Sequence, residues 1–148
     1  MHHYRRAVVA DAAGCVSLRG RTRENAVSEQ RLADVGITVE SWGNHIRTGK
    51  LPGHVCIHQG ELAGYCFGDR DTGEVVVLAL LPAFEGQGIG KDLLSRVVHD
   101  LVAAGHDRLF LGCSDDRASR SHGFYRHLGW RSTGTMDANG DEILALHP

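Results

Sequence analysis

The sequence predicts an α+β fold, in which one domain over residues 1–148 is built on a mixed β-sheet. Three short apolar stretches between 54 and 80 are separated by tight polar turns, which is typical of an antiparallel meander. A glycine-rich segment at 85–91 then opens a helical pattern, and a further strand pattern follows at 108–113. Since a strand–helix–strand crossover joins parallel strands, the sheet is expected to be mixed.

Composition excludes several classes of protein. The chain has 148 residues and a formal charge of -2, so no broad basic field favours a nucleic-acid partner. No apolar run approaches the roughly 20 residues of a membrane span, and the N-terminus lacks the apolar core of a secretory signal. We therefore expect a cytoplasmic protein with no nucleic acid or membrane as partner. The four cysteines form no C-x-x-C pair and are expected to be reduced and mostly buried: Cys15, Cys56, Cys66 and Cys113.

The sequence of the N-terminal third predicts one short strand and two helices. Residues 5–10 have a β-like pattern, and Asp11 is placed to cap a helix that runs to Leu18. Residues 19–33 are polar and irregular, either a solvated helix end and loop or a flexible wall over a substrate site. A second helix is expected to start at Thr38 or Ser41 and to end at Gly49.

The meander carries residue types that bind zinc, but no metal site is expected. Strands are predicted at 54–58, 61–67 and from Glu74 onward. His54, Cys56 and His58 share one face of the first strand. Same-face neighbours on one strand rarely converge on one ion, and no fourth ligand is apparent. We interpret them as the wetter face of a half-buried strand.

The C-terminal half predicts an amphipathic helix and a final hairpin. The helical pattern at 92–102 buries one apolar stripe and stops at Gly105. A shorter helix is expected at 117–128, with Gly129 after its end. Two strands, at 130–136 and 142–147, flank a turn at 137–140.

The segment at 85–91, EGQGIGK, has the features of an anion site. Its glycines lie between a strand and a helix N-terminus, where amide N–H groups lack intrahelical partners. The nucleoside-triphosphate pattern fails, since its first glycine would fall on Glu85 and its hydroxyl residue on Asp92. The dinucleotide pattern also fails in both registers. A purely structural turn is the alternative.

Three motifs in order resemble the GNAT acetyltransferases, which use acetyl-CoA. Gly88 and Gly90 match the glycines of that family's [QR]-x-x-G-x-[GA] loop, although Glu85 stands where Gln or Arg is usual. The strand at 74–80 resembles the family's central strand, with an acidic residue at its start. The segment at 124–130, FYRHLGW, is close to its Y-x-x-x-G-[FW] motif. The resemblance implies a GNAT-like fold, with a mixed central sheet of about six to seven strands flanked by about four helices.

The resemblance also implies two catalytic residues. Glu74 falls where some members carry a glutamate base, acting directly or through water; its alternative role is a solvated carboxylate beside a turn. Tyr125 falls where a tyrosine protonates the departing thiolate; its alternative role is a core aromatic. Amine acetylation needs such groups, because the amine must be neutral to attack and the thiolate is better protonated. Cys113 raises the alternative of a covalent acetyl-cysteine route, for which no His partner is indicated.

The same resemblance implies a cofactor site for acetyl-CoA. Leu78 and Leu80 would bind the pantetheine arm through their backbone. Lys91 would add charge near a phosphate, unless it is simply solvated. The backbone amides expected to hold the pyrophosphate belong to Gly86, Gln87, Gly88, Ile89 and Gly90.

The acceptor is expected to lie against residues 19–33. Arg23 and Asn25 are polar enough to hold a small-molecule amine or a peptide, and the sequence does not choose between them. Since dimers are common in that family, a homodimer is one expectation. Glu85 is expected to point away from the phosphates, so that Glu85→Gln changes cofactor affinity little. A non-catalytic acyl-CoA-binding or sensing module is the alternative function.

Overall fold

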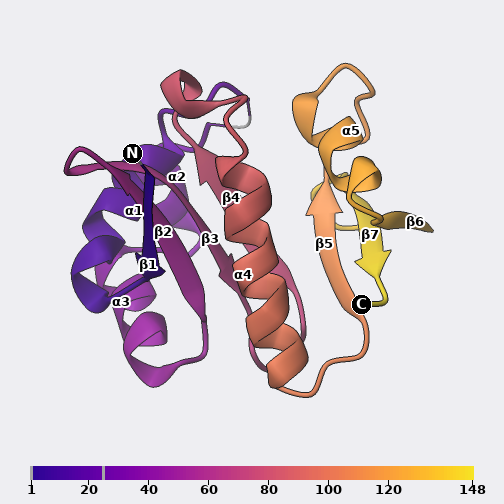
Figure 1. Cartoon of the computed structure of the whole chain (residues 1–148), viewed down its shortest axis with the longest axis horizontal. Helices are drawn as coiled ribbons and strands as arrows, with labels where there is room; N and C mark the ends of the chain where they lie inside the picture. Colours follow the sequence, from indigo (N-terminus) through magenta and orange to yellow (C-terminus); the bar gives the residue numbers. More distant parts are fainter. Residues whose placement is uncertain (1, 25) are drawn as a thin grey trace.

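The computed structural model describes residues 2–24 and 26–148 as two β-sheets with helices on both faces (Figure 1). The first sheet has the order β1-β2-β3-β4 and is antiparallel throughout. The second has the order β5-β7-β6 and is also antiparallel. The strands are β1 (His2–Arg6), β2 (Gly53–His58), β3 (Glu61–Gly68), β4 (Val75–Leu80), β5 (Leu109–Cys113), β6 (Arg131–Met136) and β7 (Glu142–Leu146).

The two sheets meet at one parallel bridge, between Glu74 and Phe110. The amide of Phe110 donates to the carbonyl of Gly73 at 3.3 Å. Beyond this point β4 pairs with β3 and β5 pairs with β7, so β4 and β5 separate. The predicted mixed sheet and the parallel strands on either side of the glycine loop are therefore confirmed.

The described residues form five helices, one more than the sequence implied. The additional helix, at Glu29–Asp34, begins inside 19–33, the segment expected to be irregular. It forms because the Ser28 hydroxyl accepts a hydrogen bond from the Arg31 amide and caps its start. The helices are α1 (Ala12–Arg19), α2 (Glu29–Asp34), α3 (Val39–Thr48), α4 (Ile89–Ala103) and α5 (Arg120–His127).

The N-terminal strand and cap differ from expectation. β1 ends at Arg6, and residues 9–11 form a 3-10 turn rather than a strand. Asp11 occupies the position before α1 but makes no side-chain cap bond there. Its carboxylate instead accepts from the Val8 amide at 2.7 Å and from both Arg5 amino groups. Burial raises the Asp11 pKa, but these bonds outweigh it and hold the pKa below its usual value.

The helix α3 begins and ends as predicted. The Thr38 hydroxyl accepts from the Ser41 amide, and the Ser41 hydroxyl accepts from the Thr38 amide. Gly49 follows the helix with a positive φ of 79°, which a side chain would strain.

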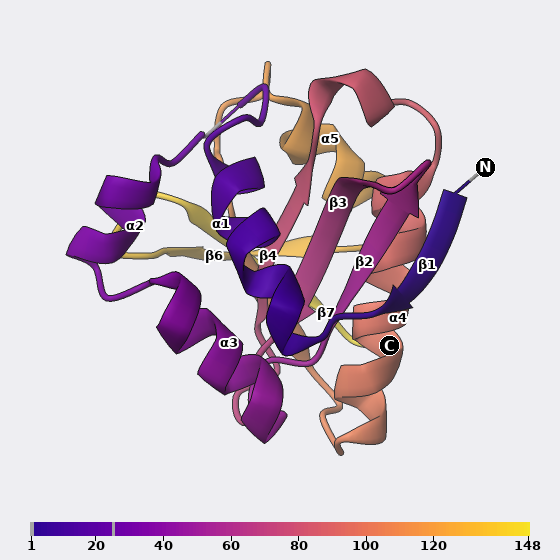
Figure 2. The same cartoon turned by 90° about the vertical axis from the view of Figure 1, so that its left-hand side faces the viewer.

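Helices cover both faces of the first sheet (Figures 1 and 2), and each face buries a hydrophobic core. On one face α4 packs across β2, β3 and β4, and on the other α1 and α3 pack around Trp42 and Phe67. The α4 contact is close, because a Cβ at Gly68 would lie 2.9 Å from Val97 and 3.0 Å from Leu101. Helix α4 is therefore held rigidly against the sheet, with its N-terminus at the end of β4.

Of the three β2 residues that could bind zinc, His54 and Cys56 are buried by this packing, and His58 at the end of the strand is partly exposed. His54 is 8% exposed and Cys56 is fully buried, so the interpretation of a wetter strand face is wrong. His54 Nε2 lies 2.8 Å from Asp100 Oδ2 on α4. Within residues 2–24 and 26–148, no three metal-ligating side chains gather into a site. In the same residues, no helix has the length and apolar character needed to cross a membrane.

We expect Leu101→Ala to lower the free energy of unfolding by about 2–5 kcal/mol, because it leaves a cavity between α4 and β3. Val102→Ala is the matched control, since Val102 is the next residue and is 43% exposed. The control should change stability by less than about 0.5 kcal/mol. Urea unfolding followed by circular dichroism measures both, and equal losses would contradict the burial described.

Candidate active site

The separation of β4 from β5 opens a cavity of about 1110 Å³. Its walls come from β4, β5, the glycine loop, α5 and the segment between α1 and α2, which are distant in the sequence. Such a volume suits a large ligand. Its lining includes Arg23, Glu24, Val76, Leu78, Leu80, Glu85, Gly86, Gly88, Ile89, Gly90, Lys91, Cys113, Arg120, Tyr125 and Asp141.

The glycine loop presents the start of α4 to this cavity. Gly86 and Gly88 have φ of 77° and 81°, and Gly88 is the residue before the helix. No side chain caps this helix start. The first-turn amides and the positive end of the helix dipole are therefore available to an anion. A Cβ at Gly86 or Gly88 would meet no atom within 4 Å, so the loop is open on its outer side.

The loop residues expected to bind the cofactor lie in two places. Gly86, Gly88, Ile89, Gly90 and Lys91 all line the cavity. The side chain of Gln87 turns back, and its Nε2 donates to the Ala83 carbonyl at 3.4 Å. Gln87 is not among the lining residues, so only its backbone N–H remains as the group expected to bind the pyrophosphate.

The strand β4 lines the cavity along most of its length, including Leu78 and Leu80. Its register with β3 shifts, since Phe67 pairs with Val77 and Gly68 with Val75. Val76 is thus an extra residue in the ladder, a β-bulge, and is 45% exposed. A bulge leaves backbone groups unpaired beside the point where β4 and β5 separate.

Tyr125 lies at the cavity wall and is also packed among aromatic side chains. It lines the cavity, yet it is only 9% exposed and packs edge-on against Phe124 and Trp130. Burial raises the pKa of its hydroxyl, with Cys66 and Cys113 adding to the shift. The hydroxyl is therefore a proton donor at neutral pH, held in place by aromatic contacts.

Glu74 lies apart from Tyr125, at the closed end where β4 and β5 still pair. It is not among the lining residues of the cavity, which begin at Val75 on this strand. Burial raises the pKa of its carboxyl group, and the charges of Asp69 and Asp137 add to the shift.

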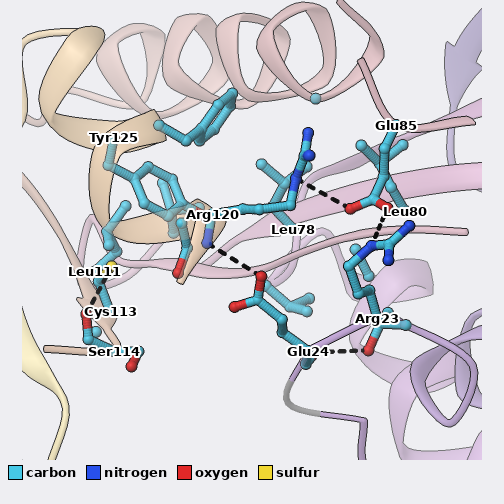
Figure 3. A pocket seen from close by; sticks show the side chains of 18 of the residues that line it. Arg23, Glu24, Leu78, Leu80, Glu85, Leu111, Cys113, Ser114, Arg120 and Tyr125 are labelled. Carbon is cyan, nitrogen blue, oxygen red and sulfur yellow. Dashed lines mark hydrogen bonds and ion pairs between the residues drawn. The ribbon is translucent and has the colours of Figure 1, made fainter. Parts of the chain in front are cut away.

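Arg23 faces the glycine loop, as an ion-pair partner of Glu85. Arg23 Nε lies 2.7 Å from Glu85 Oε1, and Arg120 Nε lies 3.2 Å from Glu85 Oε2 (Figure 3). The Arg120 amide donates to Glu24 Oε1 at 3.1 Å. The other expected acceptor residue, Asn25, lies outside the described residues.

Sequence reasoning missed two charged lining residues, Arg120 and Asp141, whereas Glu24 belongs to the segment expected to hold the acceptor. Asp141 lies in the turn between β6 and β7, and burial together with Asp137 and Asp115 raises its pKa. Nothing in the local pattern distinguishes these residues from solvated charges. Only the approach of three distant segments brings them to one cavity.

Cys113 also lines the cavity but is 3% exposed. Burial raises the pKa of its thiol, although a hydrogen bond with Ser121 and the charge of Arg126 oppose the shift. Its Sγ lies 3.5 Å from the Ser114 carbonyl. A thiol that stays protonated is a poor nucleophile, and all four cysteines are buried and free of disulfides.

Comparison with known proteins places this arrangement in a family. The model of the acetyltransferase (GNAT) family matches residues 12–130. The PaiA N-acetyltransferase of Thermoplasma acidophilum, in complex with coenzyme A, has a TM-score of 0.83 at 17% identity, over 100% of this chain and 99% of that one. A Salmonella typhimurium protein with acetyl-CoA bound has a TM-score of 0.73 at 21% identity, over 99% and 94%.

A curated relative matches only in part. The mycothiol acetyltransferase of Beutenbergia cavernae is 37% identical over 62 residues, which are 42% of this chain and 20% of the relative. The match thus spans about a fifth of the relative's length.

The chain belongs to the acetyltransferase (GNAT) family, since the family model covers most of its length. The GNAT-like fold that the three motifs implied is confirmed. An acetyltransferase, the class of enzyme expected from the three motifs, is the class that this family describes.

We expect Cys113 to resist alkylation in the folded protein at neutral pH, because it is buried and protonated. Mass spectrometry after iodoacetamide treatment should show less than one label per chain, with labelling that becomes faster as the pH rises. In urea all four thiols should react. Rapid labelling of native Cys113 would contradict this result and would reopen a covalent route.

Proposed function

We propose that the protein is an N-acetyltransferase that moves an acetyl group from acetyl-CoA to a primary amine. The observation that carries this proposal is the cavity itself. It joins an uncapped helix start, the backbone of a diverging strand and a buried tyrosine hydroxyl. These three features correspond, in order, to the pyrophosphate, the pantetheine arm and the thiol of coenzyme A.

The residues present fit acetyl-CoA. The amides of residues 86–90 and the helix dipole would hold the pyrophosphate, and Lys91 would add a positive charge beside it. The backbone of Leu78 and Leu80 would hydrogen-bond the pantetheine arm, because β4 is an edge strand whose other side pairs with no strand among the described residues. When bound, acetyl-CoA supplies an activated thioester carbonyl. The bulge at Val76 would place backbone N–H groups near the carbonyl oxygen, where they stabilise developing charge.

Tyr125 would act as the general acid. Its hydroxyl stays protonated well above neutral pH, so it can give a proton to the departing thiolate sulfur. Its burial against Phe124 and Trp130 keeps the donor in one orientation.

Glu74 would act as the general base for the acceptor amine. Because it does not line the cavity, we place a water molecule between its carboxylate and the amine. The amine would then attack the acetyl carbonyl directly, and the proton that it loses would pass to Glu74. Asp141 is the rival base, since it does line the cavity and its pKa is also raised.

The acceptor would be a small molecule or a peptide with a primary amine, bound against the segment that carries Arg23. Asn25 stays part of this proposal. The named relatives do not narrow the acceptor: their structures are too distant in sequence, and the curated match covers too little of the relative.

The alternative is a module that binds acyl-CoA without catalysis. The buried Tyr125 hydroxyl at the cavity wall argues against it, because binding alone needs no proton donor there. Calorimetry with acetyl-CoA and thiol release across a panel of amines separate the two. Absence of binding at millimolar acetyl-CoA would overturn both, whereas binding without thiol release for any amine would favour the module.

We expect Tyr125→Phe to lower kcat on the order of a hundredfold while the Kd for acetyl-CoA changes less than about twofold. The phenyl ring keeps the packing and removes only the proton donor. Steady-state thiol release and calorimetry measure the two quantities. An unchanged kcat would remove the acid role from Tyr125.

We expect kcat/KM to fall as the pH drops through the pKa of Glu74, since a base must be ionised to accept a proton. Because that pKa is raised, the acid limb should lie above the ordinary value of about 4.3 for glutamate. Glu74→Gln should remove this limb and lower kcat by about a hundredfold. Asp141→Asn is the matched comparison; a larger loss there would transfer the role to Asp141.

A further inference from the structure

The carboxylate of Glu85 joins two arginines from different parts of the chain (Figure 3). Oε1 pairs with Arg23 at 2.7 Å and Oε2 with Arg120 at 3.2 Å. The Glu85 side chain is 16% exposed, whereas the arginine side chains are 58% and 60% exposed. The anion is thus covered by its two cations, which are themselves on the surface.

A second contact links the same segments. Glu24, next to Arg23, accepts a hydrogen bond from the backbone amide of Arg120 at 3.1 Å. Arg120 is the first residue of α5, where amides lack intrahelical partners. The Thr22 hydroxyl bonds the Glu24 carbonyl at 2.9 Å and steadies this part of the segment. Residues 22–24 therefore contact both the glycine loop and the start of α5.

These contacts lie at the open end of the cavity, away from the bridge that joins the two sheets. The sheets share one parallel bridge at the closed end of the cavity, and β4 and β5 diverge from there. Glu85 is the first residue of the glycine loop, and Arg120 begins the helix that carries Tyr125. Arg23 belongs to the wall expected to bind the acceptor. One carboxylate thus connects the phosphate loop, the proton donor's helix and the acceptor wall.

We propose that Glu85 is a positioning residue for acetyl transfer, which holds the acceptor segment and helix α5 against the phosphate loop through Arg23 and Arg120. The transfer step itself rests on the proposed function above. Loss of Glu85 would loosen the acceptor segment and the orientation of Tyr125, so acceptor KM would rise and kcat would fall. Acetyl-CoA affinity would change little, because the loop amides that bind phosphate are untouched.

The competing role for the two arginines is direct phosphate binding, with Glu85 masking them. The two roles predict opposite effects on the cofactor. Under masking, Glu85→Gln would free two guanidinium groups and tighten acetyl-CoA binding, and Arg120→Gln would weaken it. Under positioning, both variants leave the Kd for acetyl-CoA within about twofold of the native value.

The test uses Glu85→Gln, Arg120→Gln and the double variant of the full chain. Glutamine offers one acceptor oxygen and turns its NH₂ group toward the second arginine, so it cannot hold both. Glu61→Gln is the matched control, because Glu61 is an exposed carboxylate at the start of β3. Hydrogen exchange of the segments around 20–24 and 120–125 is measured with acetyl-CoA calorimetry and steady-state kinetics.

Positioning predicts faster exchange in both segments of Glu85→Gln and Arg120→Gln, with no change in Glu61→Gln. Acceptor KM should rise by about threefold to tenfold, and the double variant should be no worse than either single variant. Unchanged exchange in the two segments, additive losses, or tighter acetyl-CoA binding in Glu85→Gln would each overturn the proposal. If the native protein transfers no acetyl group to any amine, the proposed function fails, and the exchange and affinity results still decide whether Glu85 holds these segments.

Discussion

The divergence of β4 from β5 is the constraint on which the rest of the structure depends. The two strands touch at one parallel bridge, between Glu74 and Phe110, and then pair with different partners. The edge of β4 that faces the gap therefore keeps backbone N–H and C=O groups that no neighbouring strand pairs. These groups repeat regularly along the strand, as side-chain donors and acceptors would not. Helix α4 packs closely on β3 at Gly68, which fixes the uncapped helix start at the open end of the gap.

The site's chemistry follows from where each ionisable group lies along this gap. Tyr125 is buried among aromatic rings, so its hydroxyl remains a donor, and Cys113 is buried as a protonated thiol. Glu74 sits at the closed end, where burial raises its pKa toward the range useful for a base. Tyr125 lines the cavity and Glu74 does not, so in the proposed reaction the acid would face the thioester directly and the base would act through water.

At the open end of the cavity, the positive charges of two arginines are balanced by a carboxylate. Glu85 places a carboxylate beside the phosphate loop, but Arg23 and Arg120 both pair with it. A lone carboxylate here would repel a pyrophosphate, whereas a neutralised one contributes contacts between segments. The departure of Glu85 from the usual Gln or Arg is thus compatible with the proposed binding of a pyrophosphate by the glycine loop.

The sequence by itself determined the elements whose signals are local. Glycine spacing, the helical stripe of α4 and the hairpin turns predicted most helices and strands, because each depends on neighbours within a few positions. The resemblance to the GNAT acetyltransferases implied the fold and several cavity-lining residues, such as Gly88, Gly90 and Tyr125. Tertiary structure alone decided which charges meet. Three features bring together residues that are far apart in the chain. They are the ion pairs of Glu85 with Arg23 and Arg120, the contact of Glu24 with α5, and the packing that buries His54. Such pairings leave no periodic pattern in the sequence, because they arise only when the sheets and helices pack.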